Sequence, residues 1–91
     1  MTIIIPTPLR TYTEGKNSVE IEAGTVREAL DKLADSNGDL RKHLFTAEGK
    51  VRSFVNLYLN DEDVRYLPAR EATATKPSDT LSIIPSIAGG V

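Results

Sequence analysis

Phe54-Val55-Asn56-Leu57-Tyr58-Leu59 is the strongest strand signal in the chain and decides the fold. Apolar residues recur at alternate positions, so Val55, Leu57 and Leu59 form a row on one face of a strand, and the other three residues lie on the opposite face. The Asn60-Asp61 pair that follows is a turn signal. We therefore expect a short return strand over residues 64–67.

A second alternating stretch lies further along the chain, over residues 80–84. Leu81 and Ile83 fall on one face of this final strand, and Ser82 and Ile84 fall on the other. Residues 68–79, between the two strands, are polar and contain two prolines, so they cannot supply much core.

A helix is expected upstream of the central strand. Thr25-Val26-Arg27-Glu28 is a capping box, in which the Thr25 hydroxyl and the Glu28 carboxylate satisfy free amides at the helix start. Glu28 and Lys32 have the spacing of a favourable ion pair. Asn37-Gly38 ends the helix, and Leu40 and Leu44 can anchor a short helical stretch beyond it. The apolar stripe of the main helix contains Val26, Ala29, Leu30 and Leu33.

The N-terminal segment reads as a hairpin. Residues 2–5 are β-branched and predict a strand, which Pro6 and Pro8 interrupt because proline lacks a ladder donor. Residues 11–17 are polar and read as the hairpin loop. Residues 18–22 alternate cleanly, with Val19 and Ile21 facing inward, as in a half-buried antiparallel strand.

The order hairpin, helix, strands predicts an α+β fold, a mixed β-sheet with one main helix packed on one face. With the two terminal strands adjacent, this arrangement is the β-grasp, or ubiquitin-like, fold. We expect one domain over residues 1–86 and a flexible C-terminal Gly-Gly tail over residues 87–91.

Composition narrows the function classes. The chain has 91 residues, a net charge of −2 and no cysteine. The absence of a basic field argues against nucleic acid or an anionic membrane as a partner, and the absence of thiols removes disulfides and cysteine nucleophiles. No apolar run approaches the roughly 18 residues of a membrane span. Cytoplasm is the expected compartment.

The chain runs from Ile84 through Pro85 to Gly89-Gly90, one residue before Val91. Paired glycines usually mark a turn or a linker, and fraying is the simplest interpretation of such an ending. The alternative is a tail that enters another protein. A Gly-Gly segment has no Cβ, so it can thread a channel too narrow for any side chain.

The predicted fold together with the ending Ile-Pro-Ser-Ile-Ala-Gly-Gly resembles the ubiquitin-like sulfur carriers of the ThiS/MoaD family. This family includes the small subunits of molybdopterin synthase and the thiamine sulfur carriers. Three further stretches, residues 5–10, 54–56 and 60–65, are similar to the actinobacterial CysO-type subgroup, which delivers sulfur for cysteine synthesis. The resemblance spans essentially the whole chain.

The resemblance implies a carrier that catalyses nothing and needs no cofactor or metal of its own. A ubiquitin-activating-type adenylyltransferase would use ATP to adenylate the Gly90 carboxylate, and a sulfur donor would convert it to a thiocarboxylate. A sulfur-accepting synthase, cysteine-synthase-like or other, would consume the sulfur. Ile87, Ala88 and Gly89 would form the tail that carries Gly90 into these enzymes.

Val91 departs from the family pattern, in which the acting carrier ends at the second glycine. It is either a natural residue that a JAMM-type metalloprotease removes, an artefact, or a sign of lost activation; we favour removal. A ubiquitin-like protein modifier that uses the same tail, and a β-grasp binding module with an inert tail, remain alternatives.

The predicted docking surface is the face of the sheet opposite the helix. Ile84 points outward by alternation, and the resemblance implies that the residue before Pro85 packs against partner enzymes. Phe54 and Tyr58 extend this surface unless a loop covers them.

Two other polar features have ordinary explanations. The acidic run over residues 60–63 lacks the ligand set of a calcium loop and reads as a hairpin turn. His43 is the single histidine and has no cysteine or second histidine to join, so we expect a packing or solvated role.

Overall fold

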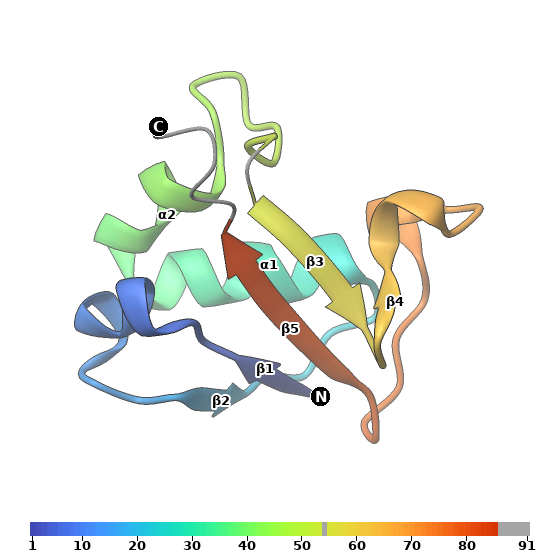
Figure 1. Cartoon of the computed structure of the whole chain (residues 1–91), viewed down its shortest axis with the longest axis horizontal. Helices are drawn as coiled ribbons and strands as arrows, with labels where there is room; N and C mark the ends of the chain where they lie inside the picture. The colour runs from blue at the N-terminus through green and yellow to red at the C-terminus, as the bar shows by residue number, and fades with distance from the viewer. Residues whose placement is uncertain (54, 86–91) are drawn as a thin grey trace.

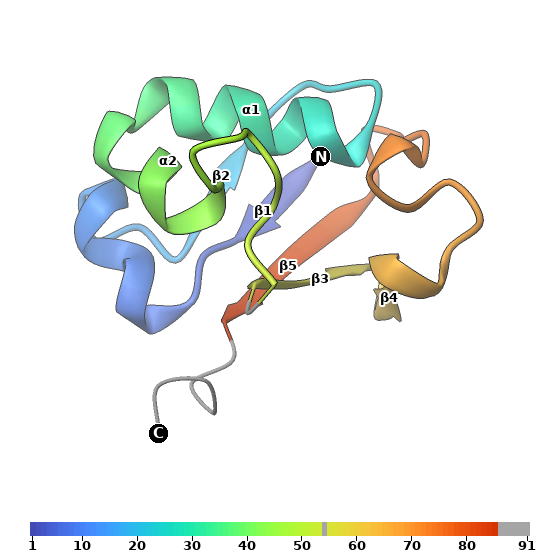
Figure 2. The ribbon, with the colours of Figure 1, turned by 90° about the horizontal axis from the view of Figure 1, so that it is seen from above.

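The computed structural model describes residues 1–53 and 55–85. Helices cover one face of a five-stranded sheet whose strand order is β2-β1-β5-β3-β4 (Figures 1 and 2). The strands are β1 (Thr2–Ile4), β2 (Ser18–Glu20), β3 (Val55–Leu59), β4 (Glu62–Asp63) and β5 (Thr80–Pro85). The α-helices are α1 (Val26–Ser36) and α2 (Gly38–Leu44), and the 3₁₀ segments are η1 (Thr7–Thr13), η2 (Val64–Tyr66) and η3 (Arg70–Ala72).

The last strand lies at the centre of the sheet. β5 runs parallel to β1, with Ile3 opposite Leu81, and antiparallel to β3, with Leu57 opposite Ile83. This pairing confirms the predicted mixed sheet with adjacent terminal strands. Because β1 and β5 are parallel, their C-terminal ends lie at the same end of the sheet (Figure 1).

The core fills the space between the inner face of the sheet and the helices. The inward rows of β3 and β5 are buried, as their alternation predicts, and the apolar stripe of α1 packs against them. The predicted short helical stretch is α2, whose Leu40 and Leu44 are fully buried. Val19 and Ile21 of the N-terminal hairpin are partly buried against the same core.

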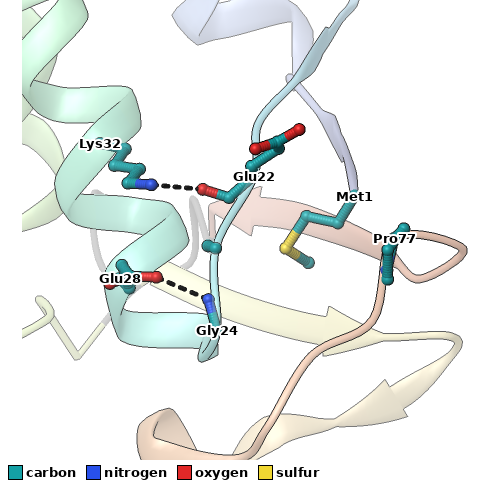
Figure 3. A pocket seen from close by; sticks show the side chains of 7 residues that line it. Met1, Glu22, Gly24, Glu28, Lys32 and Pro77 are labelled. Atoms are coloured by element: carbon teal, nitrogen blue, oxygen red, sulfur yellow. Dashed lines mark hydrogen bonds between the residues drawn. The ribbon is translucent and has the colours of Figure 1, made fainter.

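The start of α1 has the predicted cap. The Thr25 hydroxyl accepts a hydrogen bond from the Glu28 amide at 3.1 Å, and the Glu28 carboxylate accepts from the Gly24 amide at 2.6 Å. The expected ion pair between Glu28 and Lys32 is wrong. Lys32 donates instead to the Glu22 carbonyl oxygen at 2.6 Å, so both side chains fasten the segment before the helix (Figure 3).

Two predicted segments have a different form. The first residues of the expected hairpin loop, 11–13, belong to the 3₁₀ segment η1, which proline favours near its start because the fixed φ suits the first helical turn, and residues 14–17 form the turn into β2. The return strand expected over residues 64–67 is wrong. Asn60 and Asp61 both have positive φ and make a two-residue turn, so the short β4 pairs directly with β3 and the chain then leaves the sheet as η2.

Candidate functional site

The candidate site is the end of β5 from which the C-terminal segment leaves the sheet. Pro85 lies opposite Val55 at the start of β3, so the chain leaves the sheet between its central strands. The predicted tail residues Ile87, Ala88, Gly89, Gly90 and Val91 lie outside the described residues, as does Phe54.

An apolar surface lies next to this exit, on the outer face of the sheet. Ile84 of β5 is 49% exposed and Ile4 of β1 is 38% exposed. Ser82 has Ile4 opposite it on one side and Tyr58 opposite it on the other. Ile84 is two residues further along β5 and lies on the same face. Ile4, Tyr58 and Ile84 are therefore neighbours of Ser82 on the outer face of the sheet. We call Ile4, Tyr58 and Ile84 the outer apolar patch.

The predicted docking residues have mixed outcomes. Ile84 points outward, as its alternation predicts, whereas Pro85 and Tyr58 are half-buried. Ile4 was missed, although the buried residues on either side of it, Ile3 and Ile5, already imply that it faces outward. Whether these residues contact a partner remains a prediction.

A charged pair borders the patch on the β4 side. Asp63 lies opposite Tyr58, and its carboxylate accepts hydrogen bonds from the Arg65 guanidinium at 3.0 and 3.3 Å and from the Arg65 amide at 2.9 Å. The side-chain hydrogen bond from Arg65 lowers the pKa of Asp63, and the same bond raises the pKa of Arg65. Asp63 therefore stays ionised and holds the start of η2.

The acidic turn over residues 60–63 follows the other end of β3, and hydrogen bonds connect it to the segment before β5. The Asn60 side-chain amide donates to the Asp79 carboxylate at 2.8 Å, and the Lys76 amide donates to the same carboxylate at 2.8 Å. The hydrogen bond from the Asn60 side chain has the larger effect in lowering the pKa of Asp79, and the bond from the Lys76 amide lowers it further. Within residues 1–53 and 55–85, no three His, Cys, Asp or Glu side chains are grouped to hold a metal ion.

A pocket of about 520 Å³ lies near the start of β5 (Figure 3). Met1 and Pro77 form one side of it, and Glu28 and Lys32 of α1 form the other. Met1 immediately precedes the Thr2–Thr80 pair, where β5 begins, whereas the tail leaves where β5 ends. This pocket therefore lies at the opposite end of β5 from Pro85.

His43 has a packing role, as expected. Its ring lies 4.5 Å from the Tyr12 ring, measured between centroids, and thereby links α2 to η1.

Comparison with known proteins identifies the family of the chain. The model of the ThiS family matches residues 3–90. The chain belongs to the ThiS family. It is 37% identical to the sulfur carrier protein CysO of Mycobacterium tuberculosis over 92 residues, which cover 99% of this chain and 98% of the relative.

Solved structures agree with this assignment. A chain in the crystal structure of the Amycolatopsis orientalis BexX/CysO complex superimposes with a TM-score of 0.84 and 44% identity, covering 98% of each chain. A crystal structure of small archaeal modifier protein 1 of Haloferax volcanii superimposes with a TM-score of 0.76 and 26% identity, covering 94% of this chain and 95% of the relative. The fold is thus the β-grasp fold of these ubiquitin-like proteins.

The ThiS-family chain is a homologue of sulfur carrier proteins, and proteins of this type are small carriers rather than catalysts. Its relationship to CysO is consistent with a role connected to cysteine. Among the described residues, no helix is both long enough and apolar enough to cross a membrane.

Proposed function

We propose that this ThiS-family chain carries sulfur as a thiocarboxylate on Gly90, after Val91 has been removed. The observation that carries the proposal is the family match over residues 3–90, which reaches the second glycine, Gly90. The exposed Ile84 at the end of β5 adds support, because an apolar side chain beside the tail suits an enzyme that takes the tail in.

The chemistry follows from the weak reactivity of a carboxylate. The Gly90 carboxylate would attack the α-phosphate of ATP, releasing pyrophosphate and forming an acyl adenylate. A sulfur nucleophile would then displace AMP and leave a C–S bond in place of the C–O bond. A slender tail suits these steps, since the reacting carbon must enter the deep sites of at least two enzymes.

The partners are a ubiquitin-activating-type adenylyltransferase, which uses the ATP, and a sulfur-accepting synthase. We favour cysteine synthesis because the curated relative is a CysO sulfur carrier. The CysO of Amycolatopsis orientalis was crystallised in a complex with BexX, which supports a partner protein for a carrier of this kind. A JAMM-type metalloprotease would remove Val91, and ATP-dependent activation suits the cytoplasm.

The test compares the full-length chain with a chain that lacks Val91. Each is incubated with ATP, the activating enzyme from the same genome and a sulfide source, and the intact protein is then weighed. The shortened chain should gain the mass difference between sulfur and oxygen, whereas the full-length chain should not, because misplacing reacting atoms by about 1 Å can slow a reaction about 100-fold.

Gly90→Ala in the shortened chain is the matched variant and should react more slowly. Equal loading of both chain lengths would refute removal of Val91. Failure of both forms to react would refute the carrier role and leave a binding module.

A ubiquitin-like modifier is the second candidate. The likeness to small archaeal modifier protein 1, at 26% identity, favours it. The same activated tail would then form isopeptide bonds, so adducts on target lysines, rather than a thiocarboxylate, would be the product.

A further inference from the structure

A small pocket of about 180 Å³ lies beside β3, on the face of the sheet that α1 covers. It is bounded by residues 51–53 and by η2 and η3, which rise from β4 on the same side of the sheet (Figure 2). It therefore lies on the face opposite the outer apolar patch, and neither the tail chemistry nor that patch accounts for it.

The floor of this pocket is apolar. Val55, Leu57 and Val64 line it, and each of them is at least 93% buried. The floor is open because β4 pairs only with Tyr58 and Leu59 before the chain turns into η2. At Val55, β5 flanks β3 on one side, and within the described part of the chain no strand flanks it on the β4 side, so the pocket lies where β4 stops short.

The rim of the pocket is cationic. Arg52, Arg65 and Arg70 line it. Glu71, the one acidic residue among the described residues that line the pocket, forms a 3.3 Å ion pair with Arg27 of α1. Arg65 is balanced by Asp63. Arg70 is exposed and has a φ of 49°, so the backbone holds it at the rim in a left-handed conformation that arginine seldom adopts.

The cationic surface continues toward α2. A neighbouring pocket of about 480 Å³ shares Arg52 and is lined by Arg41 and Lys42, with no acidic residue among the described residues that line it. Arg52 also donates to the Lys42 carbonyl oxygen at 2.7 Å, which joins the two pockets. Arg41 is paired with Asp31 at 3.5 Å and with Asp35 at 2.7 Å, so Lys42 is the cation that this second pocket adds.

Both pockets lie close to the root of the tail. The Arg52 carbonyl oxygen accepts a hydrogen bond from the Val55 amide at 3.0 Å, and Val55 lies opposite Pro85 in the sheet. An enzyme that takes up the tail must therefore approach the arginine rim as well as the outer apolar patch.

We propose that the pocket between β3 and η2–η3 is a second docking surface for the activating enzyme, which would insert an aliphatic side chain and place an acidic side chain against Arg70. This proposal rests on the proposed function, since it names the partner that adenylates the tail. A phosphate or a nucleic acid would use the arginines but not the apolar floor, and for this reason we favour an acidic protein segment.

The first test measures the association rate of the shortened chain with the activating enzyme from the same genome. Arg70→Glu should slow association about tenfold at low salt, and the difference should shrink as salt rises, because rim charges act mainly on the association rate. Lys76→Glu is the matched control: it makes the same charge change on an exposed side chain near the other end of β5, and it should have a much smaller effect. Equal effects of the two variants would overturn the proposal.

The second test does not require the activating enzyme. The isotopically labelled chain is titrated with a hexapeptide of alternating glutamate and leucine, with the same peptide carrying serine in place of leucine, and with inorganic phosphate or a short RNA. Amide shifts around Val55 and Arg70 should appear with the leucine peptide and weaken with the serine peptide. Equal shifts with phosphate or RNA, or no shifts at all, would overturn the proposal.

The two tests also separate this proposal from the carrier role. If sulfur is loaded normally and Arg70→Glu behaves like Lys76→Glu, only the second docking surface fails. If no sulfur is loaded on the wild-type chain, the carrier role fails, and the peptide titration still decides whether the pocket takes an acidic, aliphatic segment.

Discussion

Ile83 and Ile84 are adjacent in β5 and chemically identical, yet the first is 2% exposed and the second 49% exposed. The first belongs to the inner face of the sheet, which α1 and α2 cover, and the second to the outer apolar patch. The comparison shows that the same side chain stabilises the fold on one face and is available to a partner on the other. Substitutions on the two faces should therefore change different measured quantities.

The largest effect is expected on the inner face, at Leu57. Leu57→Ala removes a side chain that is 95% buried in the core, so it should lower the free energy of unfolding by about 2–5 kcal/mol. Chemical denaturation followed by circular dichroism measures this loss. Ile84→Ala is the control on the outer face and should cost much less. Comparable losses at the two positions would break the distinction between the faces.

A smaller effect, on affinity rather than stability, is expected at Ile84 itself. Ile84→Asp places a charge in the outer apolar patch, so binding to the activating enzyme should weaken roughly tenfold or more, as at a buried interface residue. The melting temperature should hardly change, because the side chain is half exposed in the free chain. Calorimetry measures both quantities, and unchanged affinity would remove the patch from the proposed interface.

The sequence predicted the two faces well because side-chain alternation reports directly which face of a strand is buried. The rows of β3 and β5, the stripe of α1 and its Thr25 cap could all be predicted in this way. Ile4 could have been predicted by the same rule, since it lies between two buried isoleucines.

Segments without periodicity could not be predicted in the same way. The length of β4 depends on the left-handed conformations of Asn60 and Asp61, which fix the pairing with β3 and let the chain leave early. Arg52 and Arg70 line the same pocket although they are distant in the sequence, and only the path of η2 and η3 brings Arg70 there. The chemistry of the tail was predicted by family resemblance, and it remains to be tested.

A still smaller effect is expected at the N-terminal cap of α1, the helix that covers the inner face of the sheet. Thr25→Ala removes the hydroxyl that accepts the Glu28 amide, so it should lower the free energy of unfolding by about 1 kcal/mol. Thr25→Ser keeps an accepting hydroxyl and should retain most of the stability. Equal losses for the two variants, measured by thermal denaturation, would mean that the cap contributes little and that packing alone holds α1 against the sheet.

The smallest effect is expected at the surface clamp between Asn60 and Asp79, which lies at the end of β5 opposite the tail. Because hydrogen bonds lower the pKa of Asp79 below its usual 3.8, the ionised carboxylate stabilises the folded chain above that pH, and this contribution is lost as the pH falls through the folded pKa. Asp79→Asn should therefore be less stable than wild type at neutral pH and approach it below about pH 3.8. Glu62→Gln, an exposed carboxylate of the neighbouring turn, is the control and should show no such convergence. The measurement is the melting temperature of the three proteins between neutral and acidic pH. A constant difference between Asp79→Asn and wild type would show that the clamp acts through its geometry rather than through the charge of Asp79.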